Sequence, residues 1–172
     1  MTTRKIFGTD GIRGEAGQYP LDETTIERIG YSLAKELTRR LGRAPKIIIG
    51  GDTRESGDWI SDAITRGAVT AKSEIICAGV LTTPGVAYLT RTLQADAGVV
   101  ISASHNPYQD NGIKVFSPSG QKLDDEAEQA IEAELEADAS HFPEMEDVTA
   151  DPDIKLKELY LAFLRDEIGK GL

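Results

Sequence analysis

Three short apolar runs, separated by patterns typical of helices, constrain the fold of this 172-residue chain more than any other feature. The runs are KIIIG (46–50), EIICAGV (74–80) and AGVVIS (97–102). They are rich in β-branched residues, and glycine or polar residues follow them, as is typical of strands buried on both faces of a sheet. A chain that repeats such strands is expected to pair them largely in parallel, with helices on both faces.

Helical patterns lie before, between and after these runs. The first predicted helix carries its apolar residues at helical spacing, at Ile26, Ile29, Leu33 and Leu37. Asp22 or the Thr24–Thr25 pair is its candidate N-cap, because short oxygen-bearing side chains satisfy the first free N–H groups. Further helices are predicted over about 58–72, from Thr83 as N-cap through Leu93, and over about 124–136.

The repeat of strand and helix changes after Ser102. Only about ten residues separate GVVIS (98–102) from GIKVF (112–116), which is too short for a helical crossover. These two strands are therefore expected to be antiparallel neighbours. The sequence as a whole predicts an α/β fold, a three-layer α/β/α sandwich with a mixed, mostly parallel sheet.

Charge is distributed unevenly along the chain. The formal net charge is −10, yet residues 124–153 alone hold 13 Asp and Glu and no Lys or Arg. Residues 1–123 are nearly balanced, with 15 Lys and Arg against 13 Asp and Glu. The net charge argues against a nucleic-acid partner. We expect the acidic segment to be a solvated helix face or a binding tail. The nearly balanced charge of residues 1–123 leaves room for a local anion-binding site there.

The sequence shows no signal peptide or membrane span and has a single cysteine, which together favour a cytoplasmic location. The N-terminus MTTRKIFGTDG lacks the apolar core of a signal peptide, and no apolar run approaches the ~20 residues of a membrane span. The single cysteine, Cys77, lies in an apolar run and cannot form an intrachain disulfide. No membrane partner is expected.

The chain divides into three parts by composition. We expect one domain over residues 1–137, an acidic linker with two prolines over 138–153, and a helix over 154–172 that begins a truncated second domain. The alternative is that this last helix folds back onto the first domain, which its apolar residues Leu159 and Phe163 would favour.

Polar loops follow the predicted strands, at the edge where open α/β sheets bind ligands. They are GGDTRESG (50–57), LTTPG (81–85) and SASHNPYQDNG (102–112), and FGTDGIRG (7–14) is a fourth, glycine-rich loop. Arg13 in the last of these offers a planar fork for phosphate, although a tight turn explains its glycines equally well.

The adjacent Ser104 and His105 need a further explanation. A hydrolase triad does not explain the pair, because the G-x-S-x-G motif does not occur in the sequence. A zinc site does not explain it either, because the two histidines and one cysteine lie far apart in the sequence. Two readings of Ser104 remain: a plain turn hydroxyl, or a serine that carries a phosphoryl group, with Lys114 nearby to neutralise charge.

The motifs FGTDGIRG, GDTRESG, TTPGVAYL and ISASHNPYQDNGIKVFSPSGQKL stand in an order that resembles the first domain of the α-D-phosphohexomutases. Within that superfamily, the opening motif and the SASHNP form of the serine loop are most similar to the phosphoglucosamine mutases. The four motifs cover most of residues 6–123.

This resemblance implies that Ser104 is a catalytic phosphoserine, which exchanges its phosphoryl group with a hexosamine phosphate through a bisphosphate intermediate. It implies catalytic roles for His105, Lys114 and Arg13 as well. The residues expected to support the phosphate or the loop are Thr9, Asp10, Asn106 and Arg54. One Mg²⁺ would bind the Ser104 phosphate, and glucosamine 1,6-bisphosphate or another hexose bisphosphate would be the intermediate or activator.

The sequence departs from the family in two respects. Gly51 stands where relatives commonly carry a basic residue, and the aspartate-rich motif D-G-D-x-D-R does not occur. We therefore expect the remaining mutase domains as partners and an isolated chain that is inactive. The alternatives are the same domain of a phosphomannomutase/phosphoglucomutase, or a natural non-catalytic module; a homodimer through this domain is also expected.

Overall fold

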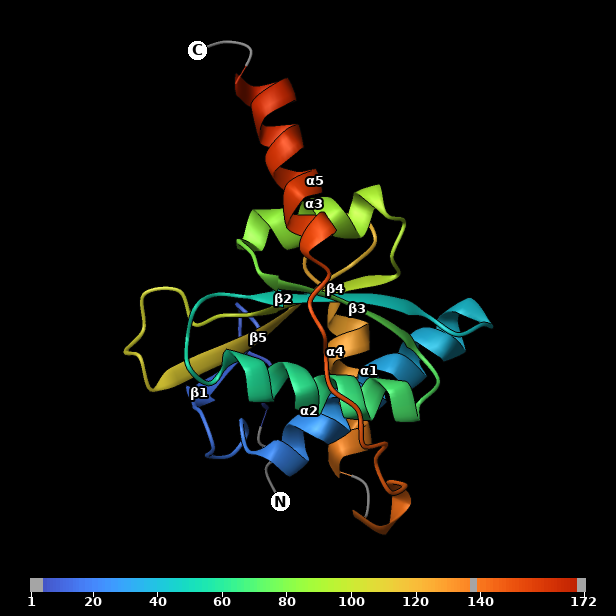
Figure 1. Ribbon diagram of the computed structural model, residues 1–172. Helices are drawn as coiled ribbons and strands as arrows, with labels where there is room; N and C mark the ends of the chain where they lie inside the picture. Colours follow the sequence, from blue (N-terminus) through green and yellow to red (C-terminus); the bar gives the residue numbers. More distant parts are fainter. Residues whose placement is uncertain (1–4, 137–138, 170–172) are drawn as a thin grey trace.

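The computed structural model describes residues 5–136 and 139–169, and these residues form one five-stranded sheet with helices on both faces (Figure 1). The strands are β1 (Ile12–Glu15), β2 (Lys46–Gly51), β3 (Glu74–Val80), β4 (Ala97–Ile101) and β5 (Asp110–Phe116), in the order β1-β5-β4-β2-β3. β2 pairs in parallel with β3 and β4, whereas β5 is antiparallel to β4 and β1. The predicted mixed α/β/α sandwich is confirmed.

Helices cover both faces of this sheet. They are α1 (Glu23–Leu41), α2 (Gly57–Thr70), α3 (Thr83–Thr92), α4 (Asp125–Glu136) and α5 (Ile154–Phe163), which continues as a π-helical turn over Leu164–Ile168. Figure 1 shows α1, α2 and α4 on one face, with α3 and the start of α5 on the other. None of the helices in the described residues combines the length and apolar character of a membrane span.

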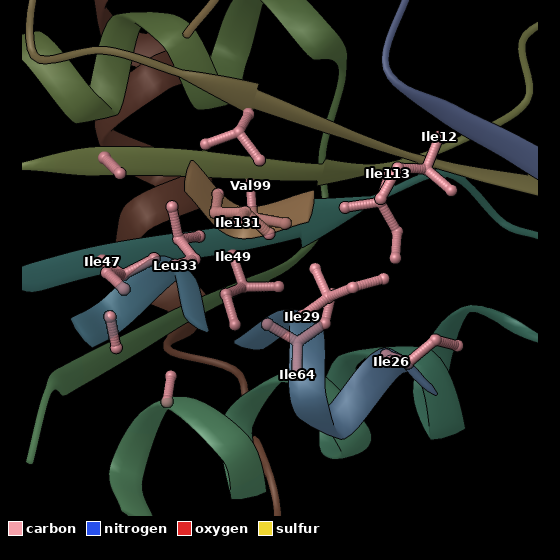
Figure 2. Close-up of a cluster of buried hydrophobic side chains, with 14 of the residues drawn as sticks. Ile12, Ile26, Ile29, Leu33, Ile47, Ile49, Ile64, Val99, Ile113 and Ile131 are labelled. Atoms are coloured by element: carbon pink, nitrogen blue, oxygen red, sulfur yellow. The ribbon is translucent and has the colours of Figure 1, made fainter. Parts of the chain in front are cut away.

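Two hydrophobic clusters fill the spaces between the layers. In the larger one, Ile49 and Val99 of the sheet pack against Leu33 of α1 and Ile131 of α4 (Figure 2). The neighbouring residue Ile48 points to the other face and joins the smaller cluster under α3. Because successive side chains of a strand alternate between faces, a strand covered on both sides must be apolar throughout.

The predicted helices and strands occur in the structure, some with bounds shifted by a few residues, and two differences go further. Asp22 is the N-cap of α1, with its Oδ1 accepting from Thr25 N–H at 3.0 Å. The N-cap of α3 is Thr82 and not the predicted Thr83, because the Thr82 hydroxyl accepts from Gly85 N–H at 3.2 Å. The second difference is β1, which the sequence analysis treated as loop; its residue Ile12 is fully buried and pairs with β5.

The acidic segment after α4 runs along the surface of the domain. Its Glu146 N–H donates to Thr70 Oγ1 and its Ala150 N–H to Asp62 Oδ1, both at 2.8 Å, so it is tied to α2. It then passes the edge of β3, where Asp153 N–H donates to the Cys77 carbonyl at 2.8 Å.

Beyond that edge, α5 packs on α3. Leu156 and Tyr160 are buried there, while Leu161 is 53% exposed. The expected boundary at 137–138 and residues 170–172 lie outside the described residues. A second domain that begins at residue 154 stays a prediction.

Candidate active site

The polar loops after β2, β3 and β4 lie at one edge of the sheet, because these three parallel strands point the same way. The first residues of two of these loops are hydrogen-bonded to the last residues of neighbouring strands: Asp52 N–H donates to Ile101 O of β4 at 3.0 Å, and Leu81 N–H donates to Gly51 O of β2 at 2.9 Å. The sheet therefore brings together the loops that the sequence analysis singled out, at the edge where α/β sheets bind ligands.

Ser104 lies in the loop between β4 and β5, with its side chain exposed and its backbone φ at +58°. This left-handed conformation is uncommon for a residue that carries a Cβ. The Ser104 N–H donates to Ser102 Oγ at 3.1 Å, and the Ser104 carbonyl accepts from Arg54 Nη2 at 3.0 Å. The peptide groups of this residue are thus held on both sides, while its hydroxyl group is left accessible.

Arg54 is a clamp on the serine loop. Four backbone carbonyls accept from its two terminal nitrogens at 2.6–3.0 Å, those of Ser104, Asn106, Pro107 and Asp110. Its Nε donates to Asp52 Oδ2 at 3.2 Å, and its side chain is only 11% exposed. Because all five donors of the guanidinium have acceptors, the geometry favours support of the loop over direct binding of phosphate.

Arg13 reaches the same loop from β1 but is held far less tightly. Its Nη1 donates to Asn106 Oδ1 at 3.4 Å and its Nη2 to Asp10 Oδ2 at 3.5 Å, both long for charge-assisted hydrogen bonds. Its Nε is buried and has no hydrogen-bond partner among the described residues. Because each terminal nitrogen of Arg13 makes only one hydrogen bond, this guanidinium, unlike that of Arg54, retains N–H groups for an incoming anion.

The N-terminal loop that carries Asp10 and leads into β1 is fixed at two points. Before it, the N–H groups of Ile6 and Phe7 donate to Glu132 Oε1 on α4 at 2.9 and 2.8 Å. Within it, Gly11 has a φ of +92°, and a Cβ there would collide with the Ile113 carbonyl of β5. Only glycine permits this close approach, which sets the loop directly against β5.

Three hollows run along this part of the surface. Ser104, Asn106 and Arg54 line one of about 490 Å³ together with Tyr108. Arg13, Thr9 and Asp10 line a second of about 560 Å³, and Lys114 lines a third of about 230 Å³, which shares Thr9 and Asp10.

The structure therefore groups most of the expected residues but places Lys114 and Ser104 in different hollows. Lys114 belongs to β5 and stands opposite Val100 of β4. Val100 lies two residues before Ser102, which directly follows β4. His105 is exposed on the loop and lines none of the three hollows.

Two residues beneath Ser104 escaped the sequence analysis. Ser102 Oγ donates to Asp52 Oδ2 at 2.7 Å while accepting the Ser104 N–H. Asp52 directly follows β2 and Ser102 directly follows β4, and both positions lie within two residues of the expected ends of these strands. This place at the ligand-binding edge was the signal that could have identified them.

The described residues contain no group of three or more His, Cys, Asp or Glu side chains placed to hold a metal ion. Carboxylates in and beside the serine loop are already engaged, Asp52 by Ser102 and Arg54, and Asp110 by Asn106 Nδ2 at 3.0 Å. Mg²⁺ binds through oxygen ligands, usually carboxylates and substrate phosphate. The residues present therefore do not form a magnesium site by themselves.

Cys77 is unsuited to nucleophilic chemistry. Its side chain is buried, and burial raises the pKa of the thiol. Since the thiolate is the reactive form, the raised pKa disfavours a catalytic cysteine.

Comparison with known proteins agrees with the fold and the motifs. Residues 4–142 match the family described as phosphoglucomutase/phosphomannomutase, alpha/beta/alpha domain I. A phosphoglucosamine mutase of Koribacter versatilis is 49% identical over 173 residues, which cover 96% of this chain and 36% of the relative. Another, of Solibacter usitatus, is 54% identical over 132 residues, covering 77% of this chain and 29% of the relative.

A solved structure has the same fold. It is a phosphoglucomutase/phosphomannomutase family protein of Burkholderia thailandensis, with a TM-score of 0.75 and 22% identity over 97% of this chain and 36% of that one. The chain thus spans about a third of the length of the relatives it matches. Since the family match covers most of the chain, the protein belongs to the phosphoglucomutase/phosphomannomutase family, as its alpha/beta/alpha domain I.

Proposed function

We propose that this chain is the phosphoserine domain of a phosphoglucosamine mutase and that Ser104 is the residue that carries the phosphoryl group. The observation that supports this most is the state of Ser104 itself. Its backbone is held on both sides by hydrogen bonds, whereas its side chain is exposed at the ligand-binding edge of the sheet. A group that must donate and accept a phosphoryl group needs this combination of fixed position and access.

The proposed reaction is a phosphoryl exchange between Ser104 and the sugar. A hydroxyl oxygen of the hexosamine phosphate attacks phosphorus, the bond from phosphorus to Ser104 Oγ breaks, and the proton lost by the sugar hydroxyl balances the one gained by the serine. The resulting hexosamine bisphosphate reorients and returns its other phosphoryl group to Ser104. The net result is interconversion of glucosamine 6-phosphate and glucosamine 1-phosphate.

The neighbouring residues have proposed roles in this exchange. Arg13, whose terminal nitrogens make only one long hydrogen bond each, contacts the oxygens of the transferring phosphoryl group, and Lys114 stabilises charge or moves the proton. Thr9 and Asp10 support the phosphate from the second hollow. Within the serine loop itself, Asn106 orients Arg13 through its side-chain oxygen, and His105 shapes the turn.

The proposal includes one Mg²⁺ and a hexose bisphosphate activator such as glucosamine 1,6-bisphosphate. The metal would offset negative charge at the phosphoryl group. Of the residues described, only Ser104, through its phosphate, is assigned to it, and no step above depends on the metal. The proposal further includes the remaining mutase domains as partners, a homodimer through this domain, and a cytoplasmic location.

A chimeric enzyme tests the proposed function. This chain replaces the matching residues of the Koribacter versatilis phosphoglucosamine mutase, and formation of glucosamine 1-phosphate is measured. The chimera should be active, and Ser104→Ala should abolish both activity and the phosphopeptide that contains residue 104. Ser119→Ala, an exposed serine of another loop, is the matched control and should retain both. Activity that survives Ser104→Ala would rule out the phosphoserine role.

A phosphomannomutase or phosphoglucomutase is the second candidate, because the matching family is named for those activities. Assays of the chimera with mannose and glucose phosphates measure the preference. A serine domain that works equally well with all three sugars would show that this chain does not set the sugar specificity.

A further inference from the structure

We infer that Asp52 is a positioning residue for phosphoryl transfer, acting on Ser104 through the hydroxyl group of Ser102. This inference rests on the proposed role of Ser104. Asp52 follows β2 and Ser102 follows β4, so the two are neighbours only because these strands pair in parallel.

The contacts form a continuous path. Ser102 Oγ donates to Asp52 Oδ2 at 2.7 Å, and the same oxygen accepts the Ser104 N–H at 3.1 Å. Ser102 is 8% exposed, so its hydroxyl has little access to competing water. The orientation of the N–H of Ser104 therefore depends on a hydroxyl that Asp52 holds in place.

Asp52 is suited to this role because its side chain accepts every hydrogen bond that it makes with the described residues. Its Oδ1 accepts from the Arg54 N–H at 3.1 Å, and its Oδ2 accepts from Arg54 Nε at 3.2 Å and from Ser102 Oγ. An ionised carboxylate accepts at both oxygens and donates at neither. It therefore forces the Ser102 proton toward itself and leaves a lone pair of Ser102 Oγ free for the Ser104 N–H.

The same carboxylate orients the clamp on the other side of Ser104. By holding Nε, Asp52 fixes the plane of the Arg54 guanidinium, whose Nη2 donates to the Ser104 carbonyl. One side chain thus controls both peptide groups of a residue whose φ of +58° would otherwise be disfavoured. Loss of this control should let the serine loop relax and move Oγ from its position for transfer.

Asp52→Asn is the discriminating variant, because it keeps the shape and replaces one acceptor by a donor. Whichever way the amide is turned, its NH₂ group faces another donor, either the Arg54 N–H or the Ser102 hydroxyl with Arg54 Nε. Asp58→Asn, an exposed carboxylate in the first turn of α2, is the matched control.

Two measurements are made on these variants. Amide hydrogen exchange in this chain, followed by NMR, should show Ser104 N–H exchanging about tenfold faster in Asp52→Asn than in wild type. In the chimera, kcat should fall about 10- to 100-fold with KM changed by less than about threefold, as expected for a misplaced reactive group. Ser102→Ala breaks only the hydroxyl path and leaves the contact between Asp52 and Arg54 intact, so it should shift both quantities in the same direction by a smaller factor. Combining the two substitutions should add little to the effect of Asp52→Asn, because the hydroxyl path is already broken there.

The outcomes separate this inference from the proposed function. An unchanged Ser104 exchange rate in Asp52→Asn overturns the inference, as does a uniform rise across β2 and β4, which would mean a general loss of stability. Faster exchange with unchanged kcat overturns it too. If the wild-type chimera is inactive, the proposed function fails, while the exchange experiment still decides whether Asp52 positions Ser104.

Discussion

Two arginines beside the same loop differ in how many of their donors are occupied. Arg54 has an acceptor for every donor, whereas Arg13 makes two long hydrogen bonds and leaves a buried Nε without a partner among the described residues. A fully engaged guanidinium stabilises the fold, and an incompletely engaged one is available for a ligand. The two side chains should therefore respond differently to removal.

We expect Arg13→Ala to lower kcat of the chimera about 100-fold, because it removes a charged donor from the transferring phosphoryl group. It should change the free energy of unfolding of this chain by less than about 1 kcal/mol, since little is lost in the absence of phosphate. Steady-state kinetics and urea denaturation measure the two quantities. Full activity of Arg13→Ala would refute its assignment.

Arg54→Ala provides the contrast. It leaves four loop carbonyls without their donor, so we expect faster proteolysis of residues 102–110 together with lost activity. A variant that loses activity while its loop remains protected would show that Arg54 acts on the phosphate directly.

At this scale the sequence revealed the residues with a distinctive motif and missed those defined by geometry. Ser104 and Arg13 stand in recognisable loops. The roles of Asp52 and Ser102 depend on the direction of a hydroxyl proton and on the pairing of two distant strands. Neither the direction of that proton nor the pairing of those strands can be inferred from local residue types.

At the scale of elements, α1 and α2 cross with their backbones in close contact. Gly30 and Gly67 lie at this crossing, and each faces the backbone of the other helix. A Cβ on Gly67 would lie 2.8 Å from Tyr31 N and from the Glu27 carbonyl carbon, which is closer than real Cβ atoms approach. Small residues here let the helices approach until the apolar side chains beside them interlock.

Gly67→Ala should therefore destabilise the protein, although alanine is the better helix former. We expect a loss of about 2 kcal/mol from overpacking, or roughly 4–8 °C in Tm. Calorimetry measures the shift.

Gly57→Ala in the same helix is the control. Its Cβ would meet only Asp52 O, at 3.7 Å, so the change in stability should stay within about 1 kcal/mol. Equal effects of the two substitutions would contradict the close-packing argument.

Strands and helices with strong internal periodicity could be predicted from the sequence, as β2, β3, β4 and α1 show. β1 could not, because its four residues include two polar or charged side chains and a glycine. It forms a strand because the edge of β5 is free to pair with it and because the side chain of Ile12 becomes buried there. The position of the N-cap of α3, Thr82 or Thr83, likewise depended on which hydroxyl reaches a free N–H.

At the scale of the whole molecule, ion pairs connect segments that are distant in the chain. Arg40 of α1 pairs with Glu36 and with Asp124, which directly precedes α4. Arg43, after α1, makes two hydrogen bonds with Asp96, at 2.7 and 2.8 Å. Asp96 also accepts the Lys46 N–H at 2.8 Å and thereby joins the starts of β2 and β4.

These contacts lower the pKa of three carboxyl groups. The hydrogen bond from Arg39 lowers the pKa of Glu36 against the opposing effect of burial, and Arg40 adds to it. Arg40 also lowers the pKa of Asp124. Burial alone would raise the pKa of Asp96, but the hydrogen bonds from Arg43 and the Lys46 N–H outweigh it.

The sign of the resulting pH dependence is fixed. A carboxyl group with a lower pKa in the folded state binds protons more weakly there than in the unfolded chain, so it stabilises the fold while ionised. The ordinary values are 4.5 for Glu36 and 3.8 for Asp96 and Asp124. The contribution of these groups to stability is fully present when the pH is above their ordinary pKa values. It is lost as the pH falls through the lower pKa values that they have in the folded state.

We therefore expect Tm to be nearly constant from about pH 7 to about pH 5 and to fall steeply below about pH 4.5. Circular dichroism melting curves measure this profile. In Glu36→Gln the fall should be shallower, because one of the groups that bind protons on unfolding is gone, whereas Glu74→Gln, an exposed carboxylate at the start of β3, should follow the wild type. If Glu36→Gln and wild type lose stability in parallel across the acid range, the Glu36 network does not contribute to the acid sensitivity of the fold.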